Sequence, residues 1–144
     1  MSKVNSLHHI VINTKYGAAT IKVGHDADPL YSYIWGIIKH KNCKLLRIGG
    51  IENHIHMLID VHQDVALSML VRDIKRASSL WIHEHASDFP MWEGWSEGYY
   101  AFSVSYNSYQ SVVDYIKSQP THHQRVPFNT ELTMMLQSHG ITDH

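Results

Sequence analysis

Two histidines separated by one residue form the pattern in this sequence that points most directly to chemistry. His54 and His56 lie in the segment Glu52 to Asp60, whose alternating residue types predict a β-strand. Side chains at positions i and i+2 of a strand project from the same face, so these two imidazoles can share one metal ion. The chain has 13 histidines, and ordinary histidines on a sheet face are therefore the alternative interpretation.

A second polar pattern lies about sixty residues further along the chain. Ser111, Tyr115, Gln119 and His122 follow one another at spacings of 4, 4 and 3, which places them on one side of a helix predicted to begin at Ser108. A tyrosine hydroxyl can act as a covalent nucleophile, and a glutamine carbonyl oxygen can bind a metal ion. A surface tyrosine and glutamine on an amphipathic helix would give the same pattern.

The elements that must position these residues follow a β-α-β-β-α-β order with a further helix at the end. The predicted strands cover about 4–15, 44–48, 52–60 and 99–105, and the predicted helices cover about 29–42, about 64–81 and a segment from 108 onward. Gly49 and Gly50 are predicted to turn the chain into the His-Ile-His strand. This order predicts an α+β, ferredoxin-like fold, in which two helices cover one face of an antiparallel sheet and the other face stays open.

The length and composition of the chain predict one domain. Of the 144 residues, 44% are apolar and 17% are charged, as in globular proteins. We expect a core from about 4 to 125 and a tail, 126–144, with weak helical character. No apolar run approaches the roughly 20 residues of a membrane span, and the first residues do not read as an export signal. The single cysteine, Cys43, excludes an internal disulfide and fits the reducing cytoplasm.

The charge distribution gives low-specificity candidates for contact with nucleic acid. The formal net charge is −1, which gives no overall attraction to DNA, but Lys75 and Arg76 form a basic pair beside the apolar stripe of the second helix. Trp95 and Tyr99 lie in or next to a loop rich in glycine and aromatic residues, where they could stack on bases. A solvated helix face and ordinary aromatic packing are the alternatives.

Taken together, the His-Ile-His strand and the later Tyr-Ile-x-x-Gln helix resemble the single-tyrosine transposases of the HUH endonuclease superfamily. This group includes small insertion-sequence transposases and REP-associated tyrosine transposases. The matching stretches, which extend the resemblance from about His9 to Arg125, are GGIENHIHMLI, VRDIKRASSLWI, GYYAFSVS and YIKSQPTHHQ. The resemblance implies a transposase and endonuclease that cleaves and rejoins single-stranded DNA near hairpins through a 5′-phosphotyrosine.

The resemblance also implies a role for individual residues. Tyr115 would be the nucleophile, and His54, His56 and Gln119 would bind Mg²⁺ or Mn²⁺, with His122 as a second-choice ligand or base. The insertion-sequence members of the family form two-fold dimers, whereas REP-associated relatives can act as monomers. We expect a homodimer, in which the tyrosine helix of one subunit completes the histidine pair of the other. The expected partner is single-stranded DNA that carries a hairpin.

Some features depart from the family pattern and keep alternatives open. Asn53 stands where an aspartate is frequent, and Pro120 directly follows Gln119, where it should kink the helix. The near-neutral charge leaves room for a catalytically inactive or domesticated hairpin-binding protein. A third hypothesis is a zinc hydrolase that uses His54, His56 and either His122 or His123.

Overall fold

One antiparallel sheet organises the chain. The structure is a computed structural model that describes residues 2–22, 24–122 and 127–141. The sheet has four strands in the order β2-β3-β1-β4, and these strands are β1 (Leu7–Asn13), β2 (Lys44–Ile51), β3 (His54–Asp60) and β4 (Tyr100–Val104). This strand order, together with the two crossover helices, is the ferredoxin-like arrangement and confirms the predicted α+β fold.

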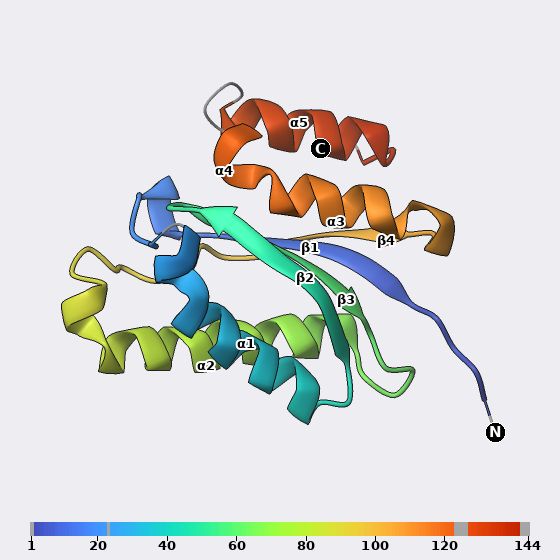
Figure 1. The fold of residues 1–144 in the computed structure, drawn as a ribbon, viewed down its shortest axis with the longest axis horizontal. Coiled ribbons are helices and arrows are strands. Elements are labelled where there is room, and N and C mark those ends of the chain that lie inside the picture. The colour runs from blue at the N-terminus through green and yellow to red at the C-terminus, as the bar shows by residue number, and fades with distance from the viewer. Residues whose placement is uncertain (1, 23, 123–126, 142–144) are drawn as a thin grey trace.

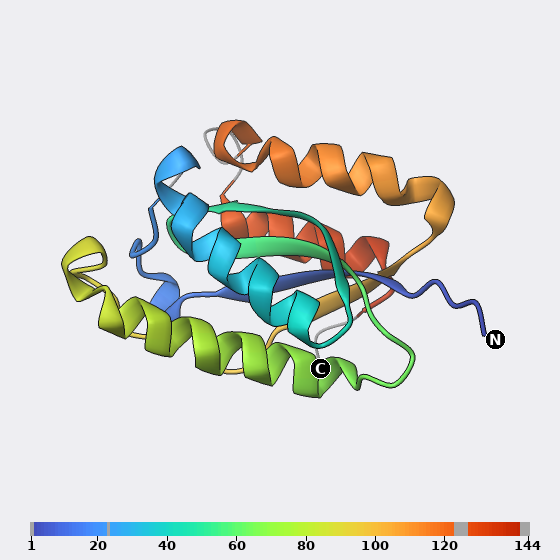
Figure 2. The same cartoon turned by 60° about the horizontal axis from the view of Figure 1, so that its bottom comes forward.

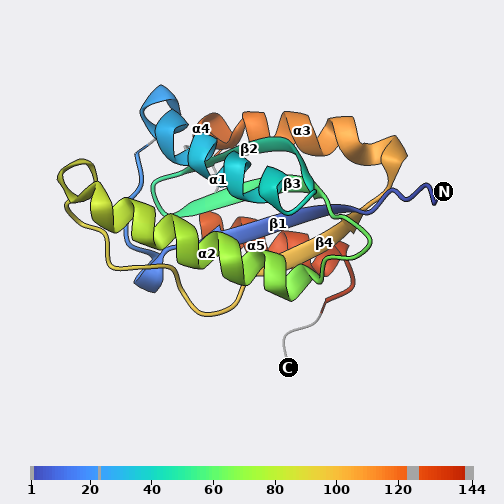
Figure 3. The ribbon, with the colours of Figure 1, turned by 90° about the horizontal axis from the view of Figure 1, so that it is seen from below.

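The helices α1 (Asp28–His40) and α2 (Leu67–Glu84) cover one face of the sheet, as Figures 1 and 3 show. Both helices place apolar residues at helical spacing toward the strands. The fully buried apolar residues of this face include Ile10, Ile12, Leu30, Ile34, Ile38, Met57, Ile59, Leu70 and Ile74. Burying each such side chain contributes about 1.5–3 kcal/mol to the stability of the fold. Because most of the buried apolar residues lie here, this face holds the main hydrophobic core.

The other face of the sheet is covered as well, by α3 (Tyr109–Lys117), α4 (Gln119–His122) and α5 (Phe128–Ser138) (Figures 1 and 2). Leu58 of β3 is fully buried there against Ile116 of α3. The face that the two crossover helices leave open is therefore covered by the last helices of the same chain. Residues 128–138 of the tail, for which the sequence predicted only weak helical character, form the helix α5, and this helix covers His54 and His56.

The alternation predicted for β3 is confirmed. His54, His56 and Leu58 point toward α3 and α5, whereas Ile55, Met57 and Ile59 point into the main core. In the pairing of β1 with β3, His9 lies opposite Leu58, and Val11 lies opposite His56. His9 is thus a diagonal neighbour of His56 on the same face of the sheet.

Two local predictions were wrong and one was confirmed. Gly49 and Gly50 lie inside β2, and the chain turns at Glu52 and Asn53 instead. Glycine is needed at 49 because a Cβ there would lie 3.0 Å from the backbone oxygen of Ile116, so the two elements pack closely. The second helix begins at Leu67 rather than near 64.

The confirmed local prediction concerns the last helical segment. The chain leaves the helix at Ser118, between α3 and α4, directly before Gln119 and Pro120, as expected from the missing amide hydrogen of proline. Among the helices in the described part of the chain, none combines the length and apolar character needed to cross a membrane.

The two glycines Gly50 and Gly36 give a test of this packing. We expect Gly50→Ala to lower the free energy of unfolding by about 1–3 kcal/mol, because a Cβ at this position would overlap the backbone oxygen of His54. Gly36→Ala is the control, since a Cβ in this exposed part of α1 meets nothing within 4 Å. It should raise stability by about 0.5–1 kcal/mol. Urea unfolding of both variants measures the difference, and equal effects would contradict the described pairing of β2 with β3.

Candidate active site

His54 lies fully buried between the turn that precedes β3 and the start of α4. Its Nδ1 is 2.7 Å from the side-chain oxygen of Asn53, and its Nε2 is 3.1 Å from Oε1 of Gln119. Asn53 can only accept through this oxygen, so Nδ1 carries a hydrogen and donates it. In the neutral ring the Nε2 lone pair then faces the Gln119 amide, and a metal ion, a proton or the amide NH2 group after a 180° turn of the side chain satisfies it.

His56 is held in a similar way from two other elements. Its Nδ1 lies 2.8 Å from Nε2 of His9 on β1, and its Nε2 lies 3.2 Å from Oε1 of Glu131 on α5. Burial, followed by the positive charge that His56 can carry, lowers the pKa of His9 to about 3. His9 is therefore neutral at physiological pH and serves as a hydrogen-bonding partner for His56.

Glu131 is the residue that sequence reasoning missed. It is only 3% exposed, although acidic side chains are rarely buried without a partner. His54, His56 and Glu131 each offer one ligand atom, and these three atoms lie within 4.8 Å of one another. A signal was present in the sequence, because Glu131 lies between Phe128 and Met135 at helical spacing and so interrupts the apolar side of the tail helix.

The donor set fits a divalent metal ion. It comprises the imidazole nitrogens of His54 and His56, the carboxylate of Glu131 and, close to His54, the amide oxygen of Gln119. Carboxylate and amide oxygens suit Mg²⁺ and Mn²⁺, and Mn²⁺ accepts imidazole more readily than Mg²⁺ does. The Gln119 amide lies 3.1 Å from Nε2 of His54, so its oxygen is within reach of an ion held by the two histidines.

Tyr115 belongs to the same cluster. Its ring lies edge-on to His56, with 5.6 Å between ring centroids, and its hydroxyl donates to Sδ of Met135 at 3.7 Å. Burial raises the pKa of Tyr115 most, the hydrogen bond and negative charge of Glu131 raise it further, and the nearby Gln119 amide opposes the shift. In this arrangement the hydroxyl keeps its proton at neutral pH.

The cluster is assembled within one chain. The break at Ser118 lets Gln119 turn inward while Tyr115 stays on α3, and both reach the histidines of their own β3. A partner subunit is therefore not required to bring these residues together, and a homodimer with a shared site stays a prediction. The side chain of His122 and all of His123 lie outside the part of the chain that the structure describes.

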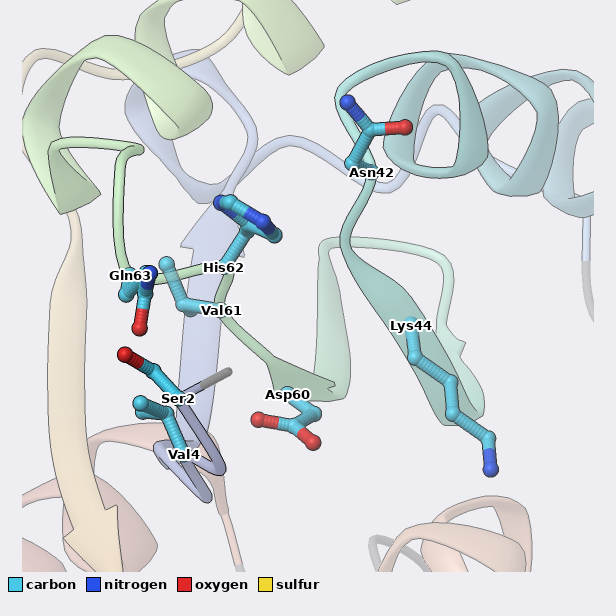
Figure 4. A pocket seen from close by; sticks show the side chains of 8 residues that line it. All are labelled: Ser2, Val4, Asn42, Lys44, Asp60, Val61, His62 and Gln63. Atoms are coloured by element: carbon cyan, nitrogen blue, oxygen red, sulfur yellow. The ribbon is translucent and has the colours of Figure 1, made fainter.

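Helix α5 closes the cluster from outside. Phe128 stacks on the His54 ring with 4.0 Å between centroids, and His139 stacks on Phe102 of β4 at 4.5 Å. As a result, His54, His56 and Gln119 are all 0% exposed. A hollow of about 400 Å³ lies elsewhere, around the other end of β3, where Asp60, Val61 and His62 line it (Figure 4).

The four candidates for nucleic-acid contact differ in whether their side chains are already bound to or packed against the rest of the fold. Lys75 donates to the backbone oxygens of Ser96 and Gly98, at 2.7 and 2.9 Å. Trp95 donates from Nε1 to the buried Ser78 hydroxyl at 3.0 Å, and Tyr99 is half-buried against the main core. These three residues attach the loop before β4 to the body of the fold. The side chain of Arg76 is exposed.

Comparison with known proteins adds independent information. A family model described as "Transposase IS200 like" matches residues 2–119. The transposases for insertion sequence element IS200 from Salmonella typhimurium strain LT2 and Salmonella typhi are each 29% identical over 119 residues, which covers 80% of this chain and 77% of each relative.

Solved structures show the same fold. A candidate transposase from Deinococcus radiodurans R1 superposes with a TM-score of 0.63 at 22% identity, covering 83% of this chain and 95% of that one. A REP-associated tyrosine transposase bound to a REP hairpin also gives a TM-score of 0.63, at 16% identity, covering 88% of this chain and 76% of that one.

Proposed function

The chain belongs to the family of IS200-like transposases, and we propose that it cleaves and rejoins single-stranded DNA beside a hairpin through a covalent bond to Tyr115. The observation that carries this proposal is the packing of Tyr115 against His56, in one buried cluster with His54, Gln119 and Glu131. A hairpin as the recognised DNA element is supported by the similarly folded REP-associated transposase, which is bound to such a hairpin.

The proposed reaction uses Tyr115 as the nucleophile. Its Oη attacks the scissile phosphorus, a bond forms between Oη and phosphorus, and the bond to the 3′ oxygen breaks. The proton of the tyrosine is released, the departing 3′ oxygen takes up a proton, and the 5′ phosphate stays on Tyr115. The reverse attack by a 3′ hydroxyl rejoins a strand, so the covalent intermediate preserves the bond energy.

His54, His56, Gln119 and Glu131 would hold a divalent ion, with Mg²⁺ and Mn²⁺ as the ions that suit these ligands. When bound, the ion would offset the charge of Glu131 in the DNA-free protein, and it would polarise the scissile phosphate once DNA is bound. The protein keeps the two imidazoles rigid, because each ring has polar partners on both nitrogens.

Access for DNA requires a shift of α5. The phosphate must reach the histidine pair, yet α5 leaves both histidines without solvent contact. Glu131 also lies where its carboxylate raises the pKa of Tyr115. We therefore propose that Glu131 holds the place of the scissile phosphate in the DNA-free protein, and that DNA binding displaces α5 and substitutes phosphate oxygens for the carboxylate.

Among the four DNA-binding candidates, the structure best supports Arg76 as a phosphate contact, because its charged side chain is exposed on α2. Lys75, Trp95 and Tyr99 would act by holding the neighbouring loop in place.

Tyr115→Phe should abolish the covalent adduct while leaving fold and DNA affinity nearly unchanged, because only the hydroxyl is removed. Labelled hairpin single strands are incubated with the protein and Mn²⁺, and adducts that resist denaturant are measured. Tyr109→Phe, on the same helix, is the matched control and should retain normal yield. Adducts with Tyr115→Phe would place the nucleophile elsewhere, and no adduct with the wild type would favour the inactive hairpin-binding alternative.

Mixing two inactive variants tests whether the site is built within one chain. The geometry predicts that His54→Ala and Tyr115→Phe stay inactive together, because Tyr115 contacts the histidines of its own chain. The same cleavage assay is used after subunit exchange is checked by tagged pull-down. If activity returns toward half of the wild-type level, the tyrosine helix is exchanged between subunits, as the family resemblance predicts.

Glu131→Gln should weaken binding of Mn²⁺ in the absence of DNA, because the site loses its only anionic ligand among the described candidates. Adduct formation should persist, since phosphate oxygens replace the carboxylate in the proposed reaction. Mn²⁺ binding is followed by electron paramagnetic resonance, with Gln137→Ala on the exposed side of α5 as the control. Loss of adduct formation in Glu131→Gln would show that the carboxylate is needed during cleavage itself.

A further inference from the structure

We propose that His9 is a positioning residue for the metal site. By accepting a hydrogen bond from Nδ1 of His56, His9 keeps the hydrogen of that ring on Nδ1 and the lone pair on Nε2, directed at the ion. This inference rests on the proposed metal-binding role of His54 and His56. His9 lies on β1, and nothing in the sequence distinguished it from the other histidines of the chain, 13 in all.

The geometry fixes the His9 ring tightly. The register of β1 and β3 makes His9 and His56 diagonal neighbours on one face. Their facing nitrogens, Nε2 of His9 and Nδ1 of His56, are 2.8 Å apart, which is a short hydrogen bond. The rings of Phe102 and Tyr115 lie edge-on to His9, each with 6.0 Å between centroids. His9 is 5% exposed, so it cannot turn away to solvent.

The direction of this hydrogen bond decides which nitrogen of His56 is available for a metal. A neutral imidazole has one N–H group and one lone pair. If His56 donates from Nδ1 to His9, its lone pair is on Nε2, the nitrogen that faces Glu131 and the His54 ring. If His9 donated instead, Nε2 of a neutral His56 would carry the hydrogen and could not bind an ion. Metal binding is therefore compatible only with His9 as the acceptor.

The two proposed ligands, His54 and His56, have the same hydrogen-bonding arrangement at Nδ1. Asn53 accepts from Nδ1 of His54, and His9 accepts from Nδ1 of His56, so both rings present Nε2 to the centre of the cluster. Partners of this kind fix the tautomer and orientation of metal-binding histidines, and losing one typically weakens metal affinity about 10–100-fold. The other core positions of β1 on this face, Leu7 and Val11, are apolar. If position 9 served only to pack against its neighbours, an apolar residue like these two would be sufficient there.

Three substitutions separate positioning from packing. His9→Leu keeps volume but removes the acceptor, His9→Gln can place Oε1 near the former Nε2, and His9→Asn is polar but too short to reach. We expect Mn²⁺ affinity in the absence of DNA to fall about 10–100-fold in His9→Leu and His9→Asn, and to recover largely in His9→Gln. Binding is measured by electron paramagnetic resonance, with His54→Ala as the variant without a complete site and circular dichroism as the check on folding.

Nitrogen-15 spectra of the metal-free proteins give a readout that does not depend on metal binding. The spectra are recorded in a Glu131→Gln background, because a carboxylate 3.2 Å from Nε2 of His56 would hold a hydrogen on that nitrogen when no ion is bound. In this background, Nδ1 of His56 should be protonated with His9 and with His9→Gln, and it should lose its hydrogen in His9→Leu. If His9→Leu does not fold, His9→Asn takes its place in both measurements.

The possible results distinguish this inference from the proposed function. Unchanged Mn²⁺ affinity and a protonated Nδ1 in His9→Leu and His9→Asn would overturn the positioning role while leaving the metal site intact. Failure of His9→Gln to restore affinity would assign His9 to packing. If the wild type binds Mn²⁺ no better than His54→Ala, the metal site of the proposed function fails, and the role of His9 fails with it.

Discussion

The hydrogen-bonding requirement of two buried imidazoles is the constraint on which the rest of this structure depends. His54 and His56 are both 0% exposed, and a buried polar atom without a partner costs about 1–3 kcal/mol. The groups that face their ring nitrogens come from four different places: Asn53 in the turn before β3 and His9 on β1 lie at the two Nδ1 atoms, and Gln119 on α4 and Glu131 on α5 lie at the two Nε2 atoms, where an ion would complete the contacts. The polar cluster therefore joins the tail to the sheet and defines how the last three helices are placed.

The same interactions also close the cluster to solvent. Burial and then Glu131 raise the pKa of Tyr115, so that its hydroxyl is harder to ionise than that of an ordinary tyrosine, and Phe128 covers His54. The buried cluster needs α5 in its present position, whereas contact between DNA and the histidines would need α5 to move away. The carboxylate resolves this conflict if it occupies the phosphate position, because a scissile phosphate can then replace it without leaving the ligands uncompensated.

The sheet divides the two tasks between its faces. The face under α1 and α2 is apolar and stabilises the fold, while the opposite face carries the three histidines His9, His54 and His56 among apolar neighbours. Glycine at position 49 allows α3 to approach β2 closely. Helix α3 also carries Tyr115, whose ring lies against His56 on the same face of the sheet.

The sequence by itself determined the fold class, the shared face of His54 and His56, and the helix break before Gln119, because strand alternation, helical spacing and the geometry of proline are local properties. Only the tertiary structure brought in His9 and Glu131, since their relevance depends on strand register and on where the tail packs. It also corrected the prediction for Gly49 and Gly50, which serve close packing rather than a turn, and it placed the last helices of the same chain over the face that the two crossover helices leave open. Long-range packing decides these points, and no local pattern in one sequence encodes it.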